Sequence, residues 1–446
     1  MSNELPQTLP PSDNRDAQAS RDAILPTGSK WPFVLLASCF LWWAIANNLT
    51  DPLVKVFKEI FGMSTFQASL IQMAFYGGYF CMALPGAMVA RRFTYKTGVL
   101  VGLGVYALGC FLLYPAMLAE QFVFFCFAYY VLACGLGVLE TNANPYVLAL
   151  GSEHTATRRL NFAQSFNPIG AVLGIVLCQV LVMARLPQDD NGNLSIATNQ
   201  ASTSLTTVII PYLSVATVLA VVWVAILMTP MPLAKEQQKE LRLISTAGRL
   251  VRNANYVFSV VAQFCYVGTQ ISVWTYTNFY IPEAIGVSQE TALKWHTGAL
   301  ILFGVMRWVF TGLMSRYRAS SLLLVAATLA AVATACVVTV GGMLGVIALV
   351  CVSGFMSMMF PTIFGLGCSD LGEDTKLASS GQIMAIIGGA IITPLQGSMV
   401  DSVGVHFSYL LPFACFVVIG AYAVFSRSIE QKSSEHSRAR SESSPS

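Results

Sequence analysis

The chain has 446 residues and a net charge of +3; 55% of its residues are apolar, 11% are charged, and its mean hydropathy is +0.64. Soluble domains carry about 25% charged residues, so this composition excludes an ordinary soluble protein and indicates an integral membrane protein. The small net charge gives no support for nucleic-acid binding. The 11 cysteines contain no C-x-x-C pair, so we interpret them as buried apolar side chains and expect no metal site.

Residues 1–30 are polar and lack the apolar core of a signal peptide, so we expect a cytoplasmic tail. A membrane-spanning helix needs about 20 predominantly apolar residues. Twelve segments meet this requirement: 31–56, 64–90, 97–118, 121–150, 159–184, 205–230, 254–281, 289–314, 320–340, 342–368, 376–400 and 404–427. The division between the ninth and tenth segments rests on a turn signal at Gly341 and Gly342.

Lysines and arginines are distributed unevenly among the connections between these segments. If both termini are cytoplasmic, most of the 25 basic residues lie on the cytoplasmic side. Cytoplasmic connections carry such an excess. The sequence therefore predicts a multi-pass protein of the cell (inner) membrane with both termini inside, including a polar C-terminal tail over residues 428–446.

A polar, basic linker over residues 231–253 separates residues 31–230 from residues 254–427. The two halves share a pattern, because residues 86–92 and 312–318 each end a span with a glycine followed by arginines. We therefore expect two pseudo-symmetric six-helix halves. Such repeats place a substrate site between them, near the middle of the membrane, which opens to each side in turn.

Glu140 is the only charged residue between positions 121 and 152. A carboxylate at this depth costs at least ~3 kcal/mol, so it is expected to face a polar cavity. Asn144 follows one turn later and is a candidate substrate ligand. The alternative is a buried ion pair between Glu140 and Arg307, the one basic residue well inside a predicted span.

A second carboxylate, Asp51, follows Asn47 and Asn48 at the end of the first span. Residues three or four apart share a helix face, so these side chains form a candidate polar site. The alternative is structural: Asp51 would cap the start of a new helical segment that has Pro52 at its first position.

Amide and aromatic side chains recur in the fifth and seventh segments. Asn161, Gln164 and Asn167 repeat every three residues, and Gln270 and Trp274 are one turn apart. Amides both donate and accept hydrogen bonds, as sugar hydroxyls require, and aromatic rings pack against the C–H faces of sugars. The alternative is that the amides join helices, for about 0.6 kcal/mol each.

No phosphate-binding loop of the form G-x-x-x-x-G-K occurs, so active transport would have to draw on an ion gradient. We also find no nucleophile–base pair within a predicted span. The sequence therefore favours a transporter over an enzyme, and we expect no cofactor.

Several motifs resemble known transporters. The turn Gly86-x-x-x-Ala90-Arg91-Arg92 resembles that of the major facilitator superfamily, although Ala90 replaces its usual acidic residue. The segments that resemble the fucose permease group of L-fucose/proton symporters are residues 47–51, 135–145, 159–167, 262–268 and 371–376.

This resemblance implies the major facilitator fold and separate roles for the polar residues in proton coupling and in sugar binding. Asp51 and Glu140 correspond to the protonatable pair of that family, and its helix-four glutamate also binds sugar. Amides at the positions of Asn48, Gln164 and Asn167 line or support its cavity.

The resemblance also implies a proton-coupled symporter that imports a monosaccharide, with L-fucose as the first expectation, and that works as a monomer in the lipid bilayer. The alternatives are a glucose/galactose transporter of the same family, an uncoupled sugar uniporter and, last, a sugar sensor that does not transport.

Overall fold

The computed structural model describes residues 25, 29–63, 65–182, 185–186, 201–231 and 243–442. Twelve helical stretches in these ranges are long and apolar enough to cross a membrane, which confirms the predicted fold class. Most of the expected N-terminal tail lies outside the described residues.

The N-terminal half contains α2 (Lys30–Phe61), α3 (Thr65–Arg92), α4 (Tyr95–Ala119), α5 (Phe122–Ala149), η1 (Glu153–Thr155), α6 (Ala156–Gln164), α7 (Asn167–Leu177), the π-helical turn η2 (Cys178–Val182) and α8 (Ala201–Met228). A short helix, α9 (Leu243–Arg252), follows in the linker, where the sequence had predicted a polar connection without assigning a helix.

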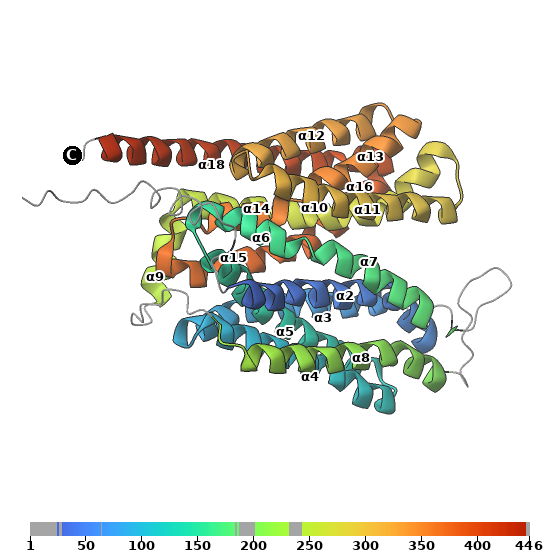
Figure 1. Cartoon of the computed structure of the whole chain (residues 1–446). Coiled ribbons are helices and arrows are strands. Elements are labelled where there is room, and N and C mark those ends of the chain that lie inside the picture. The colour runs from blue at the N-terminus through green and yellow to red at the C-terminus, as the bar shows by residue number, and fades with distance from the viewer. Residues whose placement is uncertain are drawn as a thin grey trace, which may run out of the picture.

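The C-terminal half contains α10 (Ala254–Ile285), α11 (Gln289–Leu313), α12 (Ala319–Thr339), α13 (Gly342–Met356), α14 (Met359–Gly367), η5 (Gly372–Asp374), α15 (Thr375–Met384), η6 (Ala385–Ile387), α16 (Gly388–Val403), α17 (Val405–Ser408) and α18 (Leu410–Glu442). The predicted turn between the ninth and tenth spans is present, with φ of +64° at Gly341 and +57° at Gly342. The two halves form separate layers, with α6, α7 and α15 between them (Figure 1).

Four of the predicted spans are broken into shorter helices. The fifth is divided between α6 and α7, the tenth between α13 and α14, the eleventh at the turn η6, and the twelfth between α17 and α18. The break in the fifth span has a local cause, because Pro168 stands at the start of α7 and cannot donate a backbone hydrogen bond to the carbonyl oxygen of Gln164, four residues earlier. The first span behaves differently: α2 continues through Asp51 and Pro52, so the break assumed by the structural alternative for Asp51 is absent.

Close packing of α4 against α5 fixes the position of the helix that carries Glu140. A Cβ atom at Gly135 would lie 2.1 Å from the backbone nitrogen of Tyr106, and one at Gly102 would lie 2.5 Å from that of Leu139. Small residues let membrane helices approach in this way. The glycines therefore bring the two backbones together next to the candidate site.

The two halves meet through α3, α5, α6 and α7 on one side and α11, α14 and α15 on the other. The contacts of α14 and α15 lie at the end of the molecule that also carries α9 (Figure 1). We call this the basic end, because Arg91, Arg158, Arg249 and Lys376 lie there.

Candidate functional site

Glu140 lies inside the N-terminal half with 6% of its surface exposed. Its Oε2 has no hydrogen-bond partner in the described structure. Glu140 lines a narrow gap between α2 and α5, too small to hold a water molecule, together with Cys39, Phe40, Trp43, Leu139 and Ala143. A buried carboxyl oxygen without a partner is costly, so the group is suited to bind a proton or a ligand hydroxyl.

Two aromatic side chains that the sequence did not assign to the site lie beside Glu140. Trp43 lines the gap, and its Nε1 donates a hydrogen bond to the hydroxyl of Tyr79. Tyr79 is buried and within electrostatic range of Glu140. The sequence signal for Trp43 was its position four residues before Asn47, which places both on one face of α2.

Asn144 and Gln164, both predicted substrate ligands, contact each other directly. Gln164 Nε2 donates a hydrogen bond to Asn144 Oδ1 at 2.8 Å, which joins α6 to α5. Both side chains are buried. Asn144 also lies within hydrogen-bonding range of the Glu140 carboxyl group, so the carboxyl group and the two amides form one buried polar cluster.

Arg307 does not pair with Glu140 in the part of the chain that the structure describes. Its Nε donates to the carbonyl oxygen of Ser357 at 2.5 Å, its Nη1 donates to the carbonyl oxygen of Gln164 at 3.0 Å, and its guanidinium lies 4.9 Å from the centre of the Phe303 ring. Arg307 therefore links α11 of the C-terminal half to α6 of the N-terminal half, and the ion-pair alternative is not what the structure contains.

The two predicted site residues of α10 are half-buried. Trp274 Nε1 donates to Ser353 Oγ at 3.2 Å, and its ring packs edge-on against Phe303 at 5.2 Å between centroids. Because Phe303 also contacts Arg307, Trp274 belongs to a continuous chain of contacts that reaches Gln164. Among the described residues, Gln270 makes no hydrogen bond to any of these side chains.

Three predicted residues remain, and the structure describes no hydrogen bond from any of them to Glu140, Asn144 or Gln164. Asn48 is half-buried and donates to the Ala44 carbonyl oxygen at 2.9 Å. Asn167 is half-buried at the first position of α7. Asp51 lies in α2, but its side chain is outside the described residues.

The predicted stripe of amides on the fifth span is interrupted. The break before α7 separates Gln164 from Asn167, and Asn161 serves a different purpose. Asn161 Nδ2 donates to Thr362 Oγ1 at 3.1 Å, which joins the two halves at α6 and α14. This residue is therefore a contact between the halves.

Arg159, the first residue of the predicted fifth span, is fully buried. It donates to the carbonyl oxygens of Val147 at 2.7 Å and Ser152 at 3.2 Å, and also to that of Leu148. The last carbonyls of a helix have no partner within the helix. Arg159 supplies partners for them and holds the end of α5 against α6.

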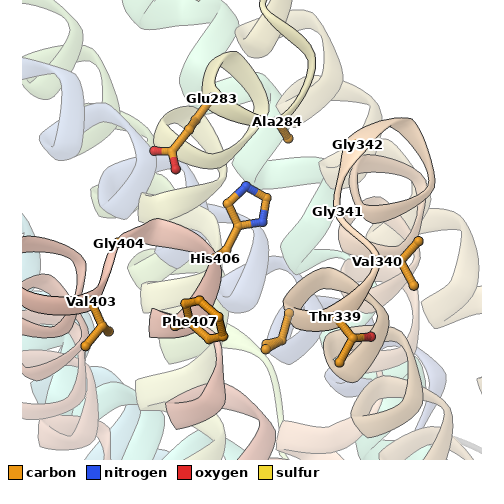
Figure 2. A pocket seen from close by; sticks show the side chains of 11 residues that line it. Glu283, Ala284, Thr339, Val340, Gly341, Gly342, Val403, Gly404, His406 and Phe407 are labelled. Carbon is orange, nitrogen blue, oxygen red and sulfur yellow. The ribbon is translucent and has the colours of Figure 1, made fainter.

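A cavity of about 450 Å³ lies elsewhere, at the ends of α10, α12 and α16 that are remote from α9. Figure 2 shows the Glu283 carboxylate and the His406 ring beside it. None of the predicted site residues lines this cavity. Among the described residues, no group of three His, Cys, Asp or Glu side chains is placed to hold a metal ion.

Comparisons with known proteins agree with this architecture. The sequence model of the Major Facilitator Superfamily matches residues 33–387. The L-fucose-proton symporter of Haemophilus influenzae is 39% identical over 408 residues, covering 88% of this chain and 95% of that protein. The glucose/galactose transporter of Brucella abortus is 33% identical over 398 residues, covering 87% and 92%. The crystal structure of a transporter of the superfamily, FucP, in the outward conformation matches with a TM-score of 0.82 at 37% identity, covering 89% of this chain and 98% of that one.

Proposed function

This chain belongs to the Major Facilitator Superfamily, in the group that contains the L-fucose-proton symporters, and we propose that it imports L-fucose together with a proton. The observation that carries the proposal is the buried carboxyl group of Glu140, which has a free oxygen and lies beside the buried amide pair of Asn144 and Gln164. A sugar hydroxyl suits both groups, because it can donate a hydrogen bond to the carboxyl group and accept one from an amide.

The residues divide into proton-coupling and substrate-binding roles. Glu140 takes part in both, and Asp51 is the second proton-coupling residue. Substrate is bound by the amides and one aromatic side chain, namely Asn48, Asn144, Gln164, Asn167, Gln270 and Trp274. Arg307 acts between the halves, because it holds α11 to the backbone of Gln164.

Orientation follows from the distribution of basic residues. The basic end and both termini lie on the cytoplasmic side of the cell (inner) membrane, since cytoplasmic connections are rich in lysine and arginine. The halves are joined at this end through α3, α5 and α6 packed on α14 and α15. The described conformation is therefore closed to the cytoplasm and corresponds to the outward conformation named for the matching FucP structure.

The transport cycle begins with a proton bound from outside at Asp51 or Glu140. Neutralising the carboxylate lowers the cost of closing the site around it, so the occupied protein reorients by movement of one half against the other. Proton and sugar leave on the cytoplasmic side, and the empty protein returns. One positive charge moved inward through 100 mV contributes about 2.3 kcal/mol. No step requires a second subunit, so the monomer is the functional unit.

A glucose/galactose transporter is the second candidate, favoured by the 33% identity to the Brucella abortus protein. Such a transporter would bind its sugar through the same carboxyl and amide groups. An uncoupled sugar uniporter is the third, because the same site would bind sugar without a proton.

The deciding experiment is the external pH of a lightly buffered suspension of energy-starved cells that express the protein. L-Fucose, D-galactose and D-glucose are added in turn. Alkalinisation by L-fucose that is absent in Asp51→Asn supports the substrate and the coupling. Alkalinisation by glucose or galactose alone would support proton symport but reject L-fucose as the substrate. Sugar entry without any pH change would support the uncoupled uniporter.

A further inference from the structure

Gln263 is a fully buried amide of α10 that makes no hydrogen bond. Neither its Nε2 nor its Oε1 has a partner in the described part of the chain. It belongs to residues 262–268, a segment that resembles the fucose permease group and contains none of the proposed proton-coupling or substrate-binding residues. Burying an amide without partners is unfavourable, so the described conformation leaves the hydrogen-bonding capacity of Gln263 unused at a cost.

Gln263 lies on the same face of α10 as two proposed substrate ligands. Gln270 and Trp274 follow it by seven and eleven residues, which correspond to about two and three helical turns. α10 begins at the basic end, next to α9 (Figure 1). Gln263, near that end, is fully buried, whereas Gln270 and Trp274 are half-buried. The face is therefore covered at the closed basic end and becomes accessible further along the helix.

Two hydroxyl groups near this part of α10 also lack partners. Tyr266, three residues after Gln263, is fully buried, and its hydroxyl has no hydrogen-bond partner among the residues described. Its ring packs against Phe360 of α14 at 6.2 Å between centroids, and Arg307 is within electrostatic range. Arg307 donates to the carbonyl oxygen of Ser357, whose own buried Oγ has no partner in the described ranges. The region where α10 meets α14 thus contains the donors and acceptors that sugar hydroxyls require.

We propose that Gln263 and Tyr266 form a second sugar subsite, which binds hydroxyl groups of the monosaccharide once the basic end has opened. This inference rests on the alternating access of the proposed function. Opening this end uncovers the buried part of the α10 face, and the sugar then supplies the partners that the amide and the phenol lack. Seven residues of helix span about 10 Å, so the subsite lies that much closer to the cytoplasm than Gln270.

The unfolding temperature of the purified protein without sugar tests whether Gln263 lacks partners in the closed state. Gln263→Leu removes both polar atoms at nearly constant volume, so it should raise the unfolding temperature by about 2 °C or more. Gln396→Leu is the matched control, because Gln396 is equally buried but donates to Ser408 Oγ at 3.2 Å. It should lower the unfolding temperature. A lower unfolding temperature in Gln263→Leu as well would assign the amide a structural partner, such as a buried water molecule, and would overturn the proposal.

Sugar kinetics measured from the two faces of the membrane test the subsite itself. Right-side-out and inverted vesicles present the outer and the cytoplasmic face, respectively. At the cytoplasmic face, the half-saturating concentration of L-fucose should rise about tenfold in Gln263→Leu and about threefold in Tyr266→Phe, as expected for lost hydrogen bonds. At the outer face it should not rise in either variant. An unchanged cytoplasmic value in both variants would reject the subsite.

Tyr280→Phe is the matched control for the loss of a phenol. The Tyr280 hydroxyl is buried in the same helix, but it donates to the carbonyl oxygen of Val337 at 3.1 Å. Its removal should leave the half-saturating concentration of L-fucose unchanged at both faces. A rise at the cytoplasmic face equal to that of Tyr266→Phe would contradict the assignment.

Deoxygenated sugars distinguish a direct contact from a change in the ratio of inward- to outward-facing molecules. Analogues of L-fucose that each lack one hydroxyl group are compared at the cytoplasmic face. If Gln263 binds a hydroxyl, the analogue without that hydroxyl should bind more weakly to the wild type but no more weakly than L-fucose to Gln263→Leu. Losses that multiply for every analogue would overturn the proposal, because a shifted conformational equilibrium weakens all sugars equally.

Uptake of L-fucose by the wild type from the outer face tests the proposed function separately. Normal uptake together with unchanged cytoplasmic half-saturation in the variants rejects the subsite alone. Absence of sugar transport by the wild type from either face rejects the proposed function and the subsite with it.

Discussion

Gln164 and Asn144 form a direct side-chain hydrogen bond of 2.8 Å, and Gln164 also accepts a hydrogen bond from Arg307 through its backbone carbonyl at 3.0 Å. Gln164 is thus in contact with the helix that carries Glu140 and with the opposite half of the molecule. A single hydrogen bond, from Gln164 to Asn144, therefore connects the polar site at Glu140 to the contact that joins the halves.

Gln164→Ala should weaken sugar binding. The change leaves Oδ1 of the buried Asn144 side chain without its partner, at a cost of about 1–3 kcal/mol. We expect the sugar concentration for half-maximal uptake to rise by about tenfold or more. Gln396→Ala is the control, because Gln396 is equally buried but donates to Ser408 Oγ in a different part of the molecule. Equal effects of the two changes on uptake would contradict the proposed role.

Gly135→Ala should destabilise the fold. Its new Cβ would lie 2.1 Å from the Tyr106 backbone nitrogen, so α4 and α5 would have to move apart. Such overpacking costs about 1–3 kcal/mol or more. Thermal unfolding of the purified protein measures the effect. Gly77→Ala, where no atom lies within 4 Å of the new Cβ, should unfold at or above the wild-type temperature. Equal unfolding temperatures for the two variants would show that the glycine contact is unimportant.

The number of spans and the grouping into halves were predictable from the sequence, because a span requires a long apolar segment and each predicted segment supplies one. The breaks were not. Pro168 and Pro361 gave local signals for the breaks before α7 and α14, but prolines also lie inside α3, α4 and α5, which are unbroken, so a proline alone does not identify a break. Apolar composition cannot reveal where such a helix is divided.

The candidate site was partly predictable for a related reason. A lone carboxylate in an apolar span stands out, so Glu140 was found, and the nearby amides followed. The contacts of Arg159 and Arg307 were not predictable, since Arg159 satisfies carbonyls at the end of α5 and Arg307 satisfies carbonyls at the breaks within two spans. As the one basic residue well inside a predicted span, Arg307 was the candidate ion-pair partner of Glu140, whereas the fold provides the carbonyl oxygens of Ser357 and Gln164.

Arg307→Lys should loosen the contact between the halves. A lysine ammonium cannot reproduce the planar fork that reaches Ser357 and Gln164 together, so at least one buried hydrogen bond is lost. We expect a loss of about 1–3 kcal/mol in stability, measured by thermal unfolding, and slower uptake. Arg316→Lys, at an exposed position after α11, should change neither. A wild-type unfolding temperature in Arg307→Lys would contradict this assignment.

Glu140→Gln should separate sugar binding from proton coupling. Glutamine keeps the size and hydrogen-bonding capacity of the protonated acid, but it cannot release or bind a proton. We expect sugar accumulation against a gradient to be lost and exchange of internal for external sugar to remain, because exchange requires no net proton movement. In the wild type, uptake should fall as the external pH rises, since the proton is a co-substrate; in the variant, exchange should not depend on external pH. Glu283→Gln, an exposed glutamate beside the cavity of Figure 2, is the matched control and should transport like the wild type. Accumulation by Glu140→Gln at the wild-type level would remove Glu140 from the coupling mechanism and leave that role to Asp51.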